Sequence, residues 1–225
     1  SEFIFLCLPT PTDFETETPD NRIVEEVIDQ LVPLVENTNK VIVIKSTVVP
    51  GTTELAIKKY PNVHFAFNPE FLTAASPVQD FRNQDRIVIG TLEESVGERL
   101  EMFYDELFND DVPIYHSMPT EAEMAKYMAN CFLATKVIFA NEIYDLCKKL
   151  AISYPEVKMM MSADTRIGKT HLDITEERGF SGMCFPKDIT ALIWLYKKVG
   201  VDCTLLEAVW QKNKQVRKNH DWMKK

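Results

Sequence analysis

A long tract without proline or glycine, Thr120 to Leu150, is the feature that most limits what this chain can fold into. The tract begins with Thr-Glu-Ala-Glu, a sequence typical of a helix start, and its apolar residues recur at helical spacing. A helix over these residues would be about 45 Å long at 1.5 Å per residue. Such a helix is long enough to join two domains, so we expect different structures on its two sides.

The sequence before the long tract alternates between apolar strands and amphipathic helices. The apolar run from Phe3 to Pro11 predicts a strand buried on both faces, and the periodic apolar residues of 20–37 predict a helix. This alternation is typical of α/β proteins with a parallel sheet. Further strands are predicted at 40–45, 64–67, 87–89 and 112–115, and a further helix at 93–108.

The sequence after the long tract predicts helices alone. We expect them at 154–163, 186–199 and 203–219, with a loop at 164–184 that holds three of the seven glycines. The chain is therefore predicted to have an α/β domain over residues 1–118 and an all-helical domain over residues 119–225.

Composition argues against several classes of protein. Asp and Glu number 34 against 25 Lys and Arg, and a net charge of -9 disfavours a general nucleic-acid binder. No apolar run approaches the roughly 20 residues of a membrane-spanning helix. The five cysteines include no CxxC pair and no signal peptide opens the sequence, so we expect a cytoplasmic protein without membrane contact.

The four histidines are scattered, and none has the spacing of a metal site, so we predict no metal. His171 lies upstream of Cys184 in the glycine-containing loop. A Cys-His hydrolase pair is an alternative that these two residues leave open, although no third orienting group is evident.

Cys184 is the candidate nucleophile. It lies just before Pro186, which suits the first turn of a helix, and close to Lys187. A helix start and a nearby ammonium both favour the thiolate, which is the reactive form of cysteine. A buried structural cysteine is the alternative. The other four cysteines are expected in the core, in a buried strand or among the apolar residues of helices: Cys7, Cys131, Cys147 and Cys203.

Three further polar groups occupy positions that suit a site. Lys126 and Asn130 are four residues apart on the predicted long helix, so they share one face and could bind an oxyanion. Ser46-Thr47 and Asn68-Pro69-Glu70 each follow a predicted buried strand, at the edge of the sheet where α/β proteins bind ligands. The alternatives are a solvated helix surface, a capping hydroxyl and a surface loop.

Five motifs in order along the chain resemble one family. They are KSTVVPGTT at 45–53, NPEFL at 68–72, AKYMAN at 125–130, RIG at 166–168 and GFSGMCFPKD at 179–188. Together they resemble the UDP-glucose/GDP-mannose dehydrogenase family. The resemblance covers nearly the whole chain but only the middle of the family's sequence. It implies that residues 1–118 are the C-terminal part of a Rossmann-like sheet, and that residues 119–225 form a helical dimerisation domain.

The resemblance implies oxidation of a nucleotide-sugar C6 alcohol to a carboxylate, with NAD as the cofactor and UDP-glucose as the expected substrate. Cys184 would form a thiohemiacetal and then a thioester. Lys126 and Asn130 would hold the oxyanion, while Glu70, Thr47 and Asp188 would handle protons.

The same resemblance implies the binding residues. Thr10, Thr47 and Lys187 would contact NAD. Arg166 would reach across a homodimer, built on the helix 120–150, to the sugar nucleotide of the neighbour. The full set implied for the substrate is Glu70, Phe71, Lys126, Asn130, Arg166 and Gly182.

The chain departs from the family at three places. Ala74 stands where relatives usually have a second glutamate, and Ser181 stands where they usually have glycine. The sequence also contains no GxGxxG turn, which in dinucleotide-binding folds cradles the pyrophosphate. In the family that turn lies in a unit that would precede Ser1, and a sugar-nucleotide domain would follow Lys225.

Two alternative functions follow from these departures. A dimerisation or scaffolding module without catalytic activity would keep the long helix and lose the cofactor. Among enzymes, oxidation of GDP-mannose or UDP-N-acetylmannosamine is the alternative, because the domain that reads the base is absent from these residues.

Overall fold

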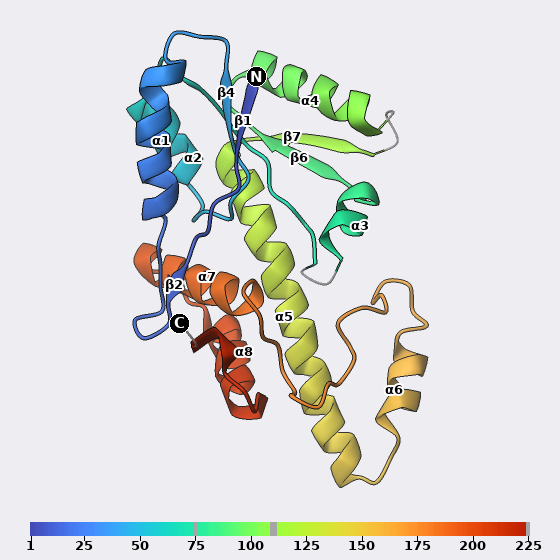
Figure 1. Ribbon diagram of the computed structural model, residues 1–225. Coiled ribbons are helices and arrows are strands. Elements are labelled where there is room, and N and C mark those ends of the chain that lie inside the picture. Colours follow the sequence, from blue (N-terminus) through green and yellow to red (C-terminus); the bar gives the residue numbers. More distant parts are fainter. Residues whose placement is uncertain (74–75, 109–111, 224–225) are drawn as a thin grey trace. The chain divides into compact units, whose positions relative to one another are not determined.

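The computed structural model describes residues 1–73, 76–108 and 112–223 (Figure 1). Its contacts divide the chain into two compact units. Unit 1 comprises residues 1–11 and 19–126, and unit 2 comprises residues 12–18 and those from 127 onward. Helix α5 (Pro119–Lys149) confirms the predicted long helix. The division between the units falls within this helix. The domain boundary at 118/119 stays a prediction.

Unit 1 contains a five-stranded sheet in the order β1-β4-β5-β6-β7. Strands β1, β4 and β5 are parallel, and so are β6 and β7. The predicted α/β class with a mostly parallel sheet is therefore confirmed. However, β5 and β6 meet antiparallel through Phe67 and Gly90, which the sequence did not predict because a short apolar strand carries no sign of its direction. The strands are β1 (Phe3–Leu6), β4 (Val41–Ile44), β5 (His64–Phe67), β6 (Ile87–Gly90) and β7 (Ile114–Ser117).

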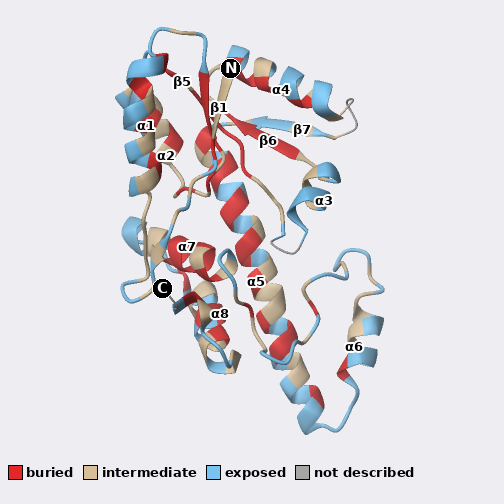
Figure 2. Cartoon of the chain, in the orientation of Figure 1, coloured by how far each residue is buried: buried red, intermediate tan, exposed pale blue. Residues whose placement is uncertain are grey.

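Helices cover both faces of this sheet. Ile42 and Ile44 belong to the same apolar cluster as Val24 and Ile28 of α1 (Arg22–Val35). The alternate β4 residues cluster instead with side chains of α4 (Glu94–Phe108), such as Leu100. All four residues of β4 are buried, as Figure 2 shows in red, because each face of the strand is covered. Two short helices, α2 (Thr52–Lys59) and α3 (Pro77–Arg82), were not predicted.

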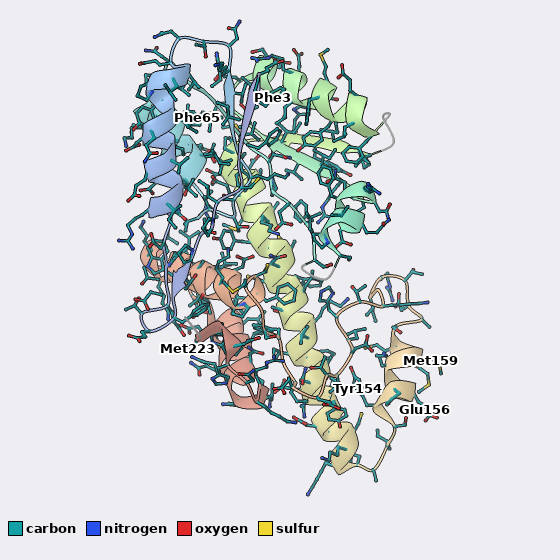
Figure 3. The ribbon with its side chains drawn as sticks, in the orientation of Figure 1. Phe3, Phe65, Tyr154, Glu156, Met159 and Met223 are labelled. Carbon is teal, nitrogen blue, oxygen red and sulfur yellow. The ribbon has the colours of Figure 1, made fainter. Side chains whose placement is uncertain are left out.

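The first strand differs from its prediction. Among the described strands, β1 pairs with β4 and lies at an edge of the sheet, so Phe3, Ile4 and Phe5 are only half-buried. Figure 3 labels Phe3 of this strand and Phe65, which is wholly buried in β5. Cys7 follows β1 and is exposed. The predictions of a strand buried on both faces and of a core position for Cys7 are therefore wrong.

The start of α5 is held closely within unit 1. Gly90 allows this approach, because a Cβ atom there would lie 2.8 Å from Cβ of Ala122. Glu121 accepts a hydrogen bond from the Met118 backbone N–H at 3.0 Å and so caps its own helix. Glu123, two residues further on, accepts hydrogen bonds from the backbone at the start of α2.

In the described part of unit 2, the elements outside residues 12–19 are all helices, joined by loops. Its core is an aromatic cluster that includes Tyr127, Phe180, Trp210 and Trp222. Glu17, beside the short strands β2 (Thr12–Asp13) and β3 (Thr18–Pro19), accepts a hydrogen bond from Trp210 Nε1 at 2.6 Å. The three shorter predicted helices are confirmed as α6 (Tyr154–Met161), α7 (Phe185–Val199) and α8 (Thr204–Val216), followed by a 3-10 turn at Asp221–Met223. Among the described residues, no helix is both long and apolar enough to span a bilayer.

Candidate active site

Unit 1 brings Glu70 and Lys126 together. Glu70 follows β5, and its Oε1 lies 3.4 Å from Nζ of Lys126 on α5. The lysine is 2% exposed, whereas the glutamate is half-buried. Thr47 and Thr10 follow β4 and β1, and both are half-buried. Since the three parallel strands end at one edge of the sheet, these side chains belong to the edge where α/β folds bind ligands.

Phe71 gives this group an aromatic ring that lies close to two cations. Lys126 Nζ lies 5.4 Å from the ring centroid, and the Arg86 guanidinium lies 3.9 Å from it. Both distances are within the range of cation–π attraction. Ala74, where relatives usually have glutamate, lies outside the described residues, so its effect stays a prediction.

A buried network behind Glu70 was missed by sequence reasoning. Lys45 Nζ and the Tyr104 hydroxyl both donate to Asn68 Oδ1, at 2.8 and 2.5 Å, and Asn68 Nδ2 donates to the Val88 carbonyl at 2.8 Å. Burial lowers the pKa of Lys45 to about 8, and nearby Lys126 acts in the same direction, against Cys7 and Glu70. A lysine directly after an apolar buried strand was the signal that could have identified it.

Unit 2 brings Asn130, Lys187 and Asp188 together. Asp188 lies in the first turn of α7 and is 1% exposed. Its Oδ2 accepts from Asn130 Nδ2 at 2.5 Å, and its Oδ1 lies 2.6 Å from Lys187 Nζ. A helix N-terminus, an ammonium and an amide therefore compensate this buried carboxylate.

Cys184 occupies the N-cap position of α7 and is exposed. Its carbonyl accepts from the Asp188 backbone N–H at 2.8 Å, which begins the helix. Gly182, also exposed, has a φ of 78°, a conformation that a side chain at that position would strain. The exposure of Cys184 contradicts the alternative of a buried structural cysteine.

The remaining cysteines of unit 2 are buried as predicted: Cys131, Cys147 and Cys203. Burial raises the pKa of Cys131, which makes its thiolate unfavourable. Accessibility therefore separates Cys184 from the other three thiols of this unit.

Arg166 and His171 lie in the loop before Cys184. The Arg166 side chain is 89% exposed and pairs with Asp164 in the same loop. The His171 ring lies 5.7 Å from that of Phe185, and burial lowers its pKa. Its Nδ1 is buried without a hydrogen-bond partner among the described residues. No group of three or more His, Cys, Asp or Glu within the described part of the chain could hold a metal ion.

Comparison with known proteins assigns both halves of the chain. Residues 1–108 match the NAD binding domain of the UDP-glucose/GDP-mannose dehydrogenase family, and residues 120–215 match the central domain of the same family. The chain belongs to the UDP-glucose/GDP-mannose dehydrogenase family, as the five sequence motifs indicated.

Named relatives agree with this assignment. The chain is 38% identical to a UDP-glucose 6-dehydrogenase of Rickettsia felis, over 96% of this chain and 48% of that protein. It is 37% identical to a UDP-glucose 6-dehydrogenase of Pseudomonas aeruginosa, over 95% and 48%. A UDP-glucose dehydrogenase structure from Pyrobaculum islandicum superposes with a TM-score of 0.83 at 34% identity, over 96% of this chain and 50% of that one. The chain thus spans about half the length of these relatives.

The match to an NAD binding domain supports NAD, and the residues present fit one end of that cofactor. Half-buried hydroxyls at the ends of parallel strands, from Thr10 and Thr47, suit a polar ring docked at the edge of the sheet. The glycine-rich pyrophosphate turn does not occur in this sequence.

Proposed function

We propose that this chain is the part of a UDP-glucose 6-dehydrogenase that holds the nicotinamide end of NAD and the reacting C6 group of the sugar. The observation that carries the proposal is the exposed Cys184 at the start of α7, next to a buried Asp188 that is paired with Lys187. The choice of UDP-glucose over GDP-mannose or UDP-N-acetylmannosamine depends on the names of the relatives. A cytoplasmic location remains part of this proposal.

The thiol of Cys184 provides covalent chemistry for the second oxidation. Bound NAD would supply the oxidising power by accepting one hydride in each oxidation. The Cys184 thiolate adds to the C6 aldehyde and, with one proton, gives a thiohemiacetal. Loss of a hydride and a proton from that adduct leaves a thioester. Water then cleaves the C–S bond, which releases the carboxylate and restores the thiol.

The surrounding side chains stabilise charge and transfer protons. Lys126 provides a buried positive charge, and Asn130 provides an amide donor one helical turn further along α5. Each suits the oxyanion that develops at C6. Glu70 and Asp188 are the carboxylates assigned to proton transfer, and Thr47 is the hydroxyl that assists them.

Substitution of the thiol tests this mechanism. In a version of the protein extended upstream by the family's first strand–helix–strand unit, Cys184→Ser should block the second oxidation far more than the first, because only the second requires the adduct. Single-turnover measurement of NADH release separates the two steps. Cys7→Ser is the matched control, since Cys7 is also exposed. Equal loss of both steps would contradict the thiohemiacetal route.

Cofactor titration separates the enzyme from the scaffold alternative. The 225-residue chain should bind NAD at millimolar strength or weaker, which corresponds to about -4 kcal/mol, because it has no glycine-rich turn. Calorimetry should show weak NAD binding by this chain and strong NAD binding by the extended version. Absence of binding in both would support a dimerisation module, and tight binding by the short chain would contradict our account of the cofactor site.

We also propose that the protein forms a homodimer through α5. An exposed apolar stripe follows this helix within unit 2, while other apolar residues of the same helix, such as Tyr127 and Ile138, are buried within the chain. Met159 on the neighbouring α6 is 64% exposed as well (Figure 3). A stripe of this length is unusual for a surface that contacts only water. Its residues are Met128, Phe132, Phe139, Leu146 and Leu150.

Light scattering tests the dimer. Phe139→Glu should convert a dimer into a monomer of 25.9 kDa, whereas Leu205→Glu, at an even more exposed apolar position on α8, should not. A wild-type monomer at tens of micromolar would contradict the dimer and, with it, the expected role of Arg166 in the partner's site.

A further inference from the structure

Glu123 has no role in the proposed reaction, yet it is wholly buried in unit 1. Its Oε2 accepts a hydrogen bond from the Gly51 backbone N–H at 2.5 Å. Its Oε1 accepts from the backbone N–H and the hydroxyl of Thr53, at 2.9 and 2.6 Å. All three donors lie at the start of α2, which has no side-chain cap of its own. Glu123 of α5 therefore caps a helix other than its own.

The contact between these two helix starts is reciprocal. Glu54, in the first turn of α2, accepts a hydrogen bond from the Thr120 backbone N–H of α5 at 3.3 Å. Each helix therefore contributes a carboxylate to the N-terminus of the other. Such an exchange fixes both the distance and the orientation of the two first turns, because carboxylate oxygens accept backbone donors over a narrow range of geometry.

The segment from Thr47 to Gly51 is fixed at both of its ends. Upstream, the Ser46 hydroxyl donates to the Leu6 carbonyl at 3.0 Å and accepts from the Leu8 N–H at 2.7 Å. Downstream, Gly51 is bound by Glu123, and its φ of 98° favours glycine. Few backbone torsions lie between these two fixed points, so Thr47 cannot move far while both hold.

We propose that Glu123 is a positioning residue, which ties the segment after Thr47 to α5 and so keeps Thr47 in place relative to Lys126. Lys126 lies one turn after Glu123 on the same helix, so one rigid element holds both. The inference rests on the proposed function for the catalytic use of Thr47 and Lys126. The tie itself does not depend on that function.

Hydrogen exchange tests the tie in the 225-residue chain. Glu123→Gln cannot accept from all three donors, so the backbone amides of residues 48–53 should exchange at least tenfold faster. Thr53→Val removes the hydroxyl donor alone and should give a smaller increase in the same segment. Glu121→Gln is the matched control, because the hydrogen bond of Glu121 caps α5 and not α2. Unchanged exchange in Glu123→Gln, or an equal increase throughout β4 and β5, would overturn the inference.

Kinetics of the extended protein test the consequence for catalysis. Thr53→Val should lower kcat severalfold while the KM for UDP-glucose changes less than twofold and the melting temperature stays close to wild type. A purely structural role would lower the melting temperature and leave kcat unchanged at permissive temperatures. Faster exchange at 48–53 with unchanged kcat would overturn the positioning role. An inactive wild-type protein that still shows the exchange pattern would count against the proposed function alone.

Discussion

A wholly buried carboxylate lies at the start of α2 and another at the start of α7, but the negative charges of the two carboxylates are compensated differently. At α2 the carboxylate is Glu123, whose donors among the described residues are the neutral groups of Gly51 and Thr53. At α7 it is Asp188, which also receives the ammonium of Lys187. Burial raises the pKa of Glu123 to about 7, although the hydrogen bonds from Thr53 and Gly51 act to lower it. At Glu123, therefore, proximity to a helix start does not by itself offset the cost of desolvation.

The largest expected effect comes from removing the ion pair at α7. Asp188→Ala should lower the free energy of unfolding by about 4 kcal/mol, because it leaves Lys187, whose side chain is 16% exposed, without its counter-charge. Urea unfolding measures the change. Glu207→Ala, which breaks the exposed Lys197–Glu207 pair, should cost less than about 1 kcal/mol. Equal costs would show that burial does not distinguish the two pairs.

The pH dependence of stability should distinguish Glu123. Because its folded pKa is raised to about 7 from 4.5, the folded state binds the extra proton between these values. Stability from this group is therefore fully present below pH 4.5 and is lost as pH rises through 7, by up to about 3 kcal/mol. Subtracting the pH profile of Glu123→Gln from that of wild type isolates this contribution. Parallel profiles would contradict the raised pKa.

Glycine-to-alanine substitutions in the loops before α2 and α7 should have smaller effects on the free energy of unfolding. Gly51 and Gly182 have φ values of 98° and 78°, and a Cβ on either would meet no atom within 4 Å. Alanine should therefore cost only backbone strain, about 1 kcal/mol at each position. Gly179→Ala should cost more, because its Cβ would lie 2.3 Å from Oδ1 of the buried Asn213. A similar cost at all three glycines would contradict this distinction.

The smallest expected effect compares two exposed thiols. Cys184 caps α7, whereas Cys7 follows a strand, so the helix dipole should favour the thiolate of Cys184 alone. Limited iodoacetamide labelling with peptide mapping should show Cys184 reacting about threefold faster than Cys7. Faster reaction of Cys7, or of the buried Cys131, would contradict the assignment of the nucleophile.

Periodicity predicted most of the fold because long elements carry repeated signals. The apolar stripe of α1 and the uninterrupted tract of α5 were evident from the sequence. The half-buried edge position of β1 was not, because an edge strand and a central strand can have the same apolar composition. The eight residues of α2 are too few to show a helical period.

The motifs indicated the candidate site residues but not the contacts among them. Lys126 and Glu70 are far apart in sequence, and only the fold shows that they form a pair. The Thr-Glu-Ala-Glu signal predicted the start of α5, but it did not specify that Glu121 bonds within that helix whereas Glu123 bonds to α2. Lys45 was passed over although its place directly after an apolar buried strand was a signal, because the strand pattern does not show that Asn68 and Tyr104 lie beside it.

Residues 12–18 pack with the helices of unit 2, and Glu17 bonds to a tryptophan that lies 193 positions further along the chain. During synthesis on the ribosome, this segment emerges early and must remain without its final partner until α8 has left the exit tunnel. Contacts of such long sequence separation form late and slow the folding of the whole unit. A fragment that begins at residue 119 would retain the helices and lose this closing contact.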